Sequence, residues 1–144
     1  TVSPNPREKA SFLKENLLPL KDSGQLNLYS SDESGFCSDV DLDLILVDGH
    51  TEKMALPKIK YKGKKILFAS DLVPTSGHIP VPYLMGYDVR PLVTMEEKST
   101  ILKDCVDKDM VLFMQHDPIN EIVVLKNTEK GVGFDTGTTL NEFF

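Results

Sequence analysis

Apolar residues in this chain gather in short runs separated by polar or proline-rich segments. Short runs of this kind, bounded by turn residues, predict β-strands. We expect strands in GQLNLYS, at residues 42–48, around Ile59 and Tyr61, at 66–69, in MVLFMQ, in EIVVLKN, and in GVGFDTGTTLNEFF, where a tail follows. Lys62-Gly63 lies between the third and fourth of these runs and predicts the turn of a β-hairpin.

Two segments show helical spacing instead. The first begins with Asn5 as the N-cap and Glu8 as its capping-box partner, and Pro19 ends it. The second begins with Thr94 and Glu97 as a capping box. Its helical spacing is supplied by Lys98, Ile101, Leu102, Cys105 and Val106.

Residues 72–93 are rich in proline and glycine. This composition forbids long regular structure and predicts a wandering loop with at most a short helix. Helices and strands therefore alternate irregularly, with a hairpin among them, and no repeat or boundary divides the chain. Such an order favours an α/β or α+β layered domain over a regular parallel array.

The bulk composition narrows the class of protein. A length of 144 residues suits one domain, and a net charge of −6 argues against nucleic acid or a membrane surface as partner. No apolar run approaches the roughly 20 residues that span a bilayer, and the charged residues among 1–18 argue against a signal peptide. Cys37 and Cys105 lack the spacing of a zinc ribbon or disulfide framework, which agrees with a cytoplasmic location. The chain opens on helix-start residues without an initiator Met, which we interpret as the later part of a longer protein.

Three predicted strands are followed by residues that can bind a metal ion. His50, Asp71 and His116 each come just after an apolar run. If these strands lie in one sheet, the three side chains meet along one edge, where open α/β sheets place their sites. Imidazole nitrogen and carboxylate oxygen suit a divalent metal such as zinc. The alternatives are a solvated turn at His50, a turn cap at Asp71 and a structural histidine at 116.

The motifs that hold these residues, DGHT, FASD and MQHD, resemble the later motifs of the metallo-β-lactamase fold superfamily. The intervals of 21 residues (71 minus 50) and 45 residues (116 minus 71) are similar to those of its lactonase and organophosphate-hydrolase-like branch. The first predicted helix and the loop PTSGHIPVPYLMGYD also resemble that branch. The resemblance implies that residues 1–144 form the C-terminal half of an αββα sandwich, with a mixed sheet and helices on its outer face.

The resemblance also implies hydrolysis at two divalent metal ions, zinc in the first instance, with iron or manganese as alternatives. Asp71 would be the catalytic, bridging carboxylate, His50 a ligand of the first ion and His116 a ligand of the second. In this family a hydroxide acidified by the metals attacks a small-molecule ester, lactone or phosphoester.

One departure from the family pattern is large. The opening signature His-x-His-x-Asp-His is absent, and the chain contains only three histidines. The metal site of this chain alone would therefore be partial or empty, and the chain alone inactive. We expect its partner to be the missing N-terminal half or a second copy of the chain.

Two other functions are compatible with the sequence. The chain could be a non-catalytic half-fold interaction module that dimerises through the exposed face of its sheet. It could also be a small protein that holds one metal ion with His50, Asp71, His116 and water.

Several loop residues are weaker candidates for the site. His78, Tyr83 and Tyr87 lie in the proline-rich loop and could line a substrate cleft. A solvated His78 and tyrosines packed onto the domain body are the competing interpretations. For Asp117, next to His116, we favour a turn with Pro118 over a role in orienting a ligand.

Overall fold

The computed structural model describes residues 4–26 and 41–144. The chain separates into two units, Thr1–Glu33 and Ser34–Phe144. The strand expected in GQLNLYS extends beyond residue 26 and lies outside the described residues. No helix in the described part of the chain is long and apolar enough to cross a membrane.

The N-terminal unit contains helix α1 (Lys14–Asp22), and the expected helix bounds were wrong at both ends. Asn5 does accept hydrogen bonds from the backbone N–H groups of Arg7 and Glu8, but residues 6–10 form only turns. Pro19 lies inside α1, where a proline removes one backbone hydrogen bond without ending the helix. The helix ends before Gly24, whose φ of 74° is the left-handed conformation that closes many helices.

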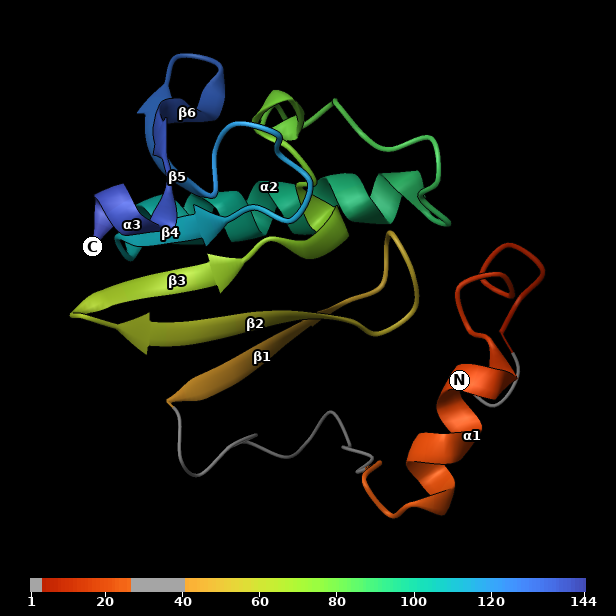
Figure 1. Cartoon of the computed structure of the whole chain (residues 1–144). Helices are drawn as coiled ribbons and strands as arrows, with labels where there is room; N and C mark the ends of the chain where they lie inside the picture. The colour runs from red at the N-terminus through yellow and green to blue at the C-terminus, as the bar shows by residue number, and fades with distance from the viewer. Residues whose placement is uncertain (1–3, 27–40) are drawn as a thin grey trace. The chain divides into compact units, whose positions relative to one another are not determined.

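The second unit is built on a six-stranded mixed sheet in the order β1-β2-β3-β4-β5-β6 (Figure 1). Its strands are β1 (Leu42–Val47), β2 (Met54–Tyr61), β3 (Lys64–Phe68), β4 (Met110–Phe113), β5 (Ile122–Thr128) and β6 (Gly131–Thr138). Neighbouring strands are antiparallel except β3 and β4, which are parallel. A β-bulge between Val124 and Leu125 interrupts the β5–β6 register, and these two strands turn steeply away from β1–β3.

The strands form where the sequence predicted them, and the reasons for their turns are visible. The β2–β3 hairpin turns at Lys62 and Gly63, both with positive φ, as a two-residue turn requires. β6 is followed by the short helix α3 (Leu140–Phe143), whose N-cap Thr139 forms a capping box with Glu142. The segment expected to be a tail is therefore partly helical.

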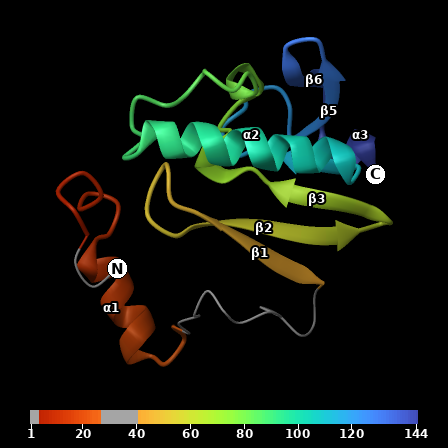
Figure 2. The ribbon, with the colours of Figure 1, turned by 180° about the vertical axis from the view of Figure 1, so that it is seen from behind.

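Helix α2 (Pro91–Asp107) connects β3 to β4 and covers one face of the sheet, as Figure 2 shows. The helix begins three residues before the expected capping box, with Pro91 in its first position. Thr94 is consequently inside the helix, where its hydroxyl donates to the carbonyl of Arg90, and Glu97 contacts the loop after β1. The expected capping box at Thr94 and Glu97 was therefore wrong.

The sheet has a fully packed face and a partly covered one. The packed face meets α2 and is formed by residues that include Val47, Leu56, Leu67, Ile101, Leu102, Cys105, Leu112 and Val123. On the opposite face, Ile66, Val111 and Ile122 are buried beneath Phe143 and Phe144. A hollow of about 390 Å³ opens on that face, lined largely by apolar side chains of β2, β3, β4 and the C-terminal segment.

The proline-rich segment after β3 contains two short 3₁₀ turns, Ser70–Leu72 and Ser76–His78, as expected for a wandering loop. The side chain of Lys98 holds this segment on α2. Its ammonium group is fully buried and donates to the carbonyls of His78 (2.9 Å), Pro80 (3.0 Å) and Tyr83 (2.6 Å). A buried ammonium with three acceptors joins the loop to the helix, because leaving either side unpaired would cost free energy.

Lys98 should give the folding stability a recognisable pH dependence. Burial lowers the pKa of Lys98 from 10.5 to about 8, against the opposing effect of Asp88. Between these two values the unfolded chain binds more protons than the folded chain, so stability rises with pH. Between pH 7 and 10 we expect the wild type to gain about 2 kcal/mol relative to Lys98→Met.

Urea unfolding of both proteins at several pH values measures this gain. Lys103→Met, which removes an exposed lysine of the same helix, is the matched control. The stability difference between the wild type and Lys103→Met should not grow with pH in this way. A constant difference between the wild type and Lys98→Met across this pH range would contradict the interpretation.

Candidate metal centre

The three strand-end residues lie at one edge of the sheet because β1, β3 and β4 run in the same direction. Each residue follows the last residue of its strand by three positions: His50 after Val47, Asp71 after Phe68, and His116 after Phe113. Phe68 and Phe113 are direct partners in the parallel β3–β4 register. Equal spacing from paired positions therefore brings Asp71 and His116 together.

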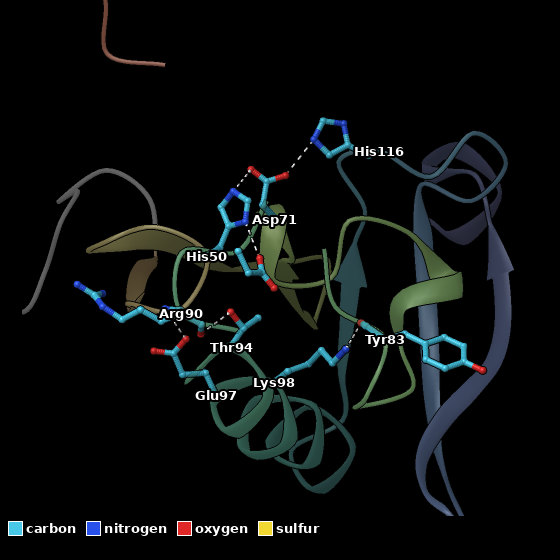
Figure 3. Close-up of polar contacts among 10 residues, drawn as sticks. His50, Asp71, Tyr83, Arg90, Thr94, Glu97, Lys98 and His116 are labelled. Carbon is cyan, nitrogen blue, oxygen red and sulfur yellow. Dashed lines mark hydrogen bonds and ion pairs between the residues drawn. The ribbon is translucent and has the colours of Figure 1, made fainter. Parts of the chain in front are cut away.

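Asp71 lies between the two histidines (Figure 3). Its Oδ2 is 3.4 Å from His50 Nε2, and its Oδ1 is 3.1 Å from His116 Nε2. The two oxygens of one carboxylate thus face two different imidazoles. Exposure increases across the group, from 13% for the His50 side chain to 51% for that of His116, so the centre is open on the His116 side.

Asp88 fixes the other side of the His50 ring. Its Oδ1 is 2.8 Å from His50 Nδ1, and its side chain is only 1% exposed. With Nδ1 bonded to this carboxylate, His50 directs Nε2 toward Asp71, the arrangement common among metal-binding histidines. Oδ2 of Asp88 is buried and has no hydrogen-bond partner among the described residues. A carboxylate behind the ring in this way orients Nε2 as a metal ligand would need it.

No sequence signal pointed to Asp88, since it lies 38 residues from His50 in a loop with no regular spacing. Lys98 did leave a signal: it occupies a core position of a predicted helix, and a lysine there needs buried acceptors.

The turn that carries His50 is packed directly on the start of α2. The Arg90 N–H donates to the Gly49 carbonyl (2.8 Å), its guanidinium donates to the Asp48 carbonyl (2.7 Å), and the Val89 N–H donates to the His50 carbonyl (3.1 Å). Gly49 itself lies against the backbone and hydroxyl of Thr94, with no room for a Cβ atom. A glycine is required at this position for close approach, since its φ is not in the left-handed region.

The loop that carries His116 is also held by backbone contacts. The His116 N–H donates to the Pro74 carbonyl, and Asp117 accepts from the N–H groups of Ser76, Ile119 and Asn120. Partial burial raises the pKa of Asp117, but these hydrogen bonds outweigh it and hold the pKa well below its usual range. The expected turn role of Asp117 is confirmed, and the turn joins the His116 loop to the Ser76 loop.

The three cleft candidates lie elsewhere in the loop. Nδ1 of His78 is 2.8 Å from the Thr75 hydroxyl. Figure 3 shows the Tyr83 ring pointing away from the His50–Asp71–His116 group, while the Tyr83 carbonyl faces Lys98. The Tyr87 side chain is exposed. A role in substrate binding for these residues stays a prediction.

The three side chains do not enclose one ion. Among residues 4–26 and 41–144, no three His, Cys, Asp or Glu side chains are arranged to hold a metal ion together. The two histidines face different oxygens of Asp71, so each oxygen has one imidazole nitrogen beside it. Imidazole nitrogen and carboxylate oxygen are donors that suit a divalent metal.

Comparison with known proteins identifies the fold. No protein-family model and no curated protein sequence matches the chain. Solved structures do match, among them a probable metal-dependent hydrolase from Staphylococcus aureus, with 22% identity and a TM-score of 0.75 over 95% of this chain. The dizinc quorum-quenching lactonase AidC, solved with a product, has 17% identity and a TM-score of 0.67 over 93% of this chain. The hydrolase AbOPH of the β-lactamase superfamily has 17% identity and a TM-score of 0.70 over 90%.

The chain spans about half the length of each of these proteins, namely 47%, 48% and 49%. A mixed six-stranded sheet with helices packed on it, matching half of a metallo-β-lactamase fold, is thus confirmed. At these identities the match establishes the fold, and the chemistry has to be argued from the residues.

The close packing of Gly49 on Thr94 makes a testable prediction. Gly49→Ala would place a methyl group inside the first turns of α2, so we expect a loss of about 2 kcal/mol or more in the free energy of unfolding. Gly86→Ala, where nothing lies within 4 Å of the added Cβ, should change stability by no more than about 0.5 kcal/mol. Thermal and urea unfolding measure both, and equal effects would contradict the packing argument.

Proposed function

We propose that this chain supplies the C-terminal half of a two-metal hydrolase centre. Asp71 would bridge the two ions, with His50 on the first and His116 on the second. The observation that carries the proposal is the position of Asp71, whose two oxygens face the Nε2 atoms of two different histidines.

The donor distances fit this assignment. Two donors bound to one tetrahedral zinc ion at about 2.1 Å lie roughly 3.4 Å apart. The His50–Asp71 and His116–Asp71 distances of 3.4 Å and 3.1 Å are close to that value. Imidazole and carboxylate also suit iron and manganese, so we take zinc as the first metal to test.

Each ion would need donors that this chain does not supply. Zinc usually binds four ligands, and His50 with Asp71, or His116 with Asp71, accounts for two. The matched hydrolases are about twice as long as the chain. We therefore propose that the other half of the fold provides the remaining ligands, at the open side of the centre near the exposed His116.

The partly covered face of the sheet is the proposed docking surface for that other half. Its apolar side chains include Leu44, Leu46, Pro57, Ile59, Ile66, Phe68 and Phe113, and the 390 Å³ hollow lies among the last five. On this face Leu46 is 36% exposed and Tyr61 is 48% exposed. Apolar surface gathered on one sheet face in this way indicates an interface.

The reaction follows from the ligand set. When bound, the two ions supply Lewis-acid activation of water and of the substrate's carbonyl or phosphoryl oxygen. Asp71 and the two histidines hold the ions, and Asp88 holds the His50 ring in register. The substrate class we propose is a small ester, lactone or phosphoester. AidC, a lactonase of the same fold, makes lactones the first substrates to test.

The metal assignment predicts the behaviour of three variants of the centre and of one control variant outside it. In the protein that carries both halves, His50→Ala or Asp71→Ala should abolish hydrolysis and lower the zinc content, with the fold largely intact. His116→Ala should remove one ion. His78→Ala removes a histidine outside the centre and should keep the full zinc content.

Elemental analysis, circular dichroism and turnover of lactone, ester and phosphoester substrates measure these effects. Unchanged turnover in either His50→Ala or Asp71→Ala would rule out the assignment.

The docking surface predicts self-association when the chain is alone. Leu46→Lys adds a charge to the exposed apolar face and should reduce association, whereas Leu92→Lys, at an exposed position on α2, should not. Sedimentation velocity measures both. A stable 16.1 kDa monomer would contradict the proposed surface.

A further inference from the structure

Glu97 makes a contact that the proposed metal centre does not by itself explain. Its carboxylate accepts hydrogen bonds from two consecutive backbone N–H groups, with Oε1 2.7 Å from the Asp48 nitrogen and Oε2 3.0 Å from the Gly49 nitrogen. Glu97 lies 49 and 48 residues away from these partners in the sequence. Hydrogen bonds to a carboxylate are about twice as strong as those between neutral groups.

The rest of the turn is held through its carbonyls. Arg90 and Val89 bind the carbonyl groups of residues 48–50, while Glu97 binds the N–H groups of residues 48 and 49. Because both the N–H groups and the C=O groups of this turn are bound, the direction in which the His50 side chain leaves the backbone is fixed. Asp88 then fixes the rotation of the ring.

We propose that Glu97 is a positioning residue that holds the His50 imidazole against Asp71. Glu97 contacts only the backbone of the turn in the contacts above, so it acts through His50 and is not a metal ligand. The proposal rests on the metal centre described under the proposed function. Displacing a ligand that has only one companion donor on the same chain should weaken metal binding, and changes around metal ligands typically cost 10–100-fold in affinity.

The test compares Glu97→Gln with the wild-type chain by NMR, with Zn²⁺ alone as the probe. Glutamine keeps the shape of the side chain but can accept with only one oxygen, so one of the two N–H groups loses its acceptor. We expect the Asp48 and Gly49 amide protons to move upfield in the variant. We also expect the His50 ring to respond to Zn²⁺ only at about 10-fold or higher concentration, with the His116 response unchanged.

Glu96→Gln is the matched control. Glu96 is exposed on the same helix, so the substitution removes the same charge without touching the turn. Its amide shifts and zinc responses should equal those of the wild type. If Glu97→Gln does not fold, Glu97→Asp, which keeps the charge but shortens the reach, takes the same test with the same expected direction.

The outcomes separate the two proposals. If wild-type His50 responds to Zn²⁺ and the variant responds at the same concentration, the positioning role is overturned and the metal centre stands. Equal weakening at His50 and His116 also overturns it, because that would be a general effect on the fold. If wild-type His50 does not respond to Zn²⁺ at any concentration, the metal centre fails and the positioning role with it.

Discussion

The parallel pairing of β3 with β4 is the constraint on which the rest of the structure depends. A parallel pair needs a crossover, which α2 and the preceding proline-rich loop provide. The register pairs Phe68 with Phe113, so Asp71 and His116 leave the sheet side by side. Because β1 runs in the same direction as β3, His50 reaches the same edge from two strands away. The donors come together through strand direction and equal spacing.

Two adjacent side chains of the crossover helix α2 bind the loops around this edge of the sheet. Glu97 binds the turn that carries His50, and Lys98 binds the proline-rich loop through three carbonyls. Burying a charge is costly unless hydrogen bonds compensate it. These contacts therefore favour the one position of each loop in which the hydrogen bonds form. Asp88 connects the two systems, because it binds His50 and also acts on the charge of Lys98.

Two features of the described residues point to the same proposed partner: the number of metal donors and the uncovered face of the sheet. Asp71 faces two histidines but no third donor completes either position among the described residues. The sheet face away from α2 keeps an apolar hollow and exposed apolar side chains. Under the proposed function, one partner would satisfy both features, namely the second half of the fold, since the matched hydrolases are about twice as long as this chain.

The sequence by itself determined the strands, the hairpin, the second helix and the three motif residues, because these depend on local periodicity and turn chemistry. It misplaced α1, since the turn formed by Asn5 does not continue into a helix and Pro19 does not end one. It also assigned Glu97 to a cap within its own helix. Only the tertiary structure decided the partners of Asp88, Glu97 and Lys98, which lie 15 to 49 residues away. Contacts over such separations depend on strand order and direction, and local sequence does not encode these.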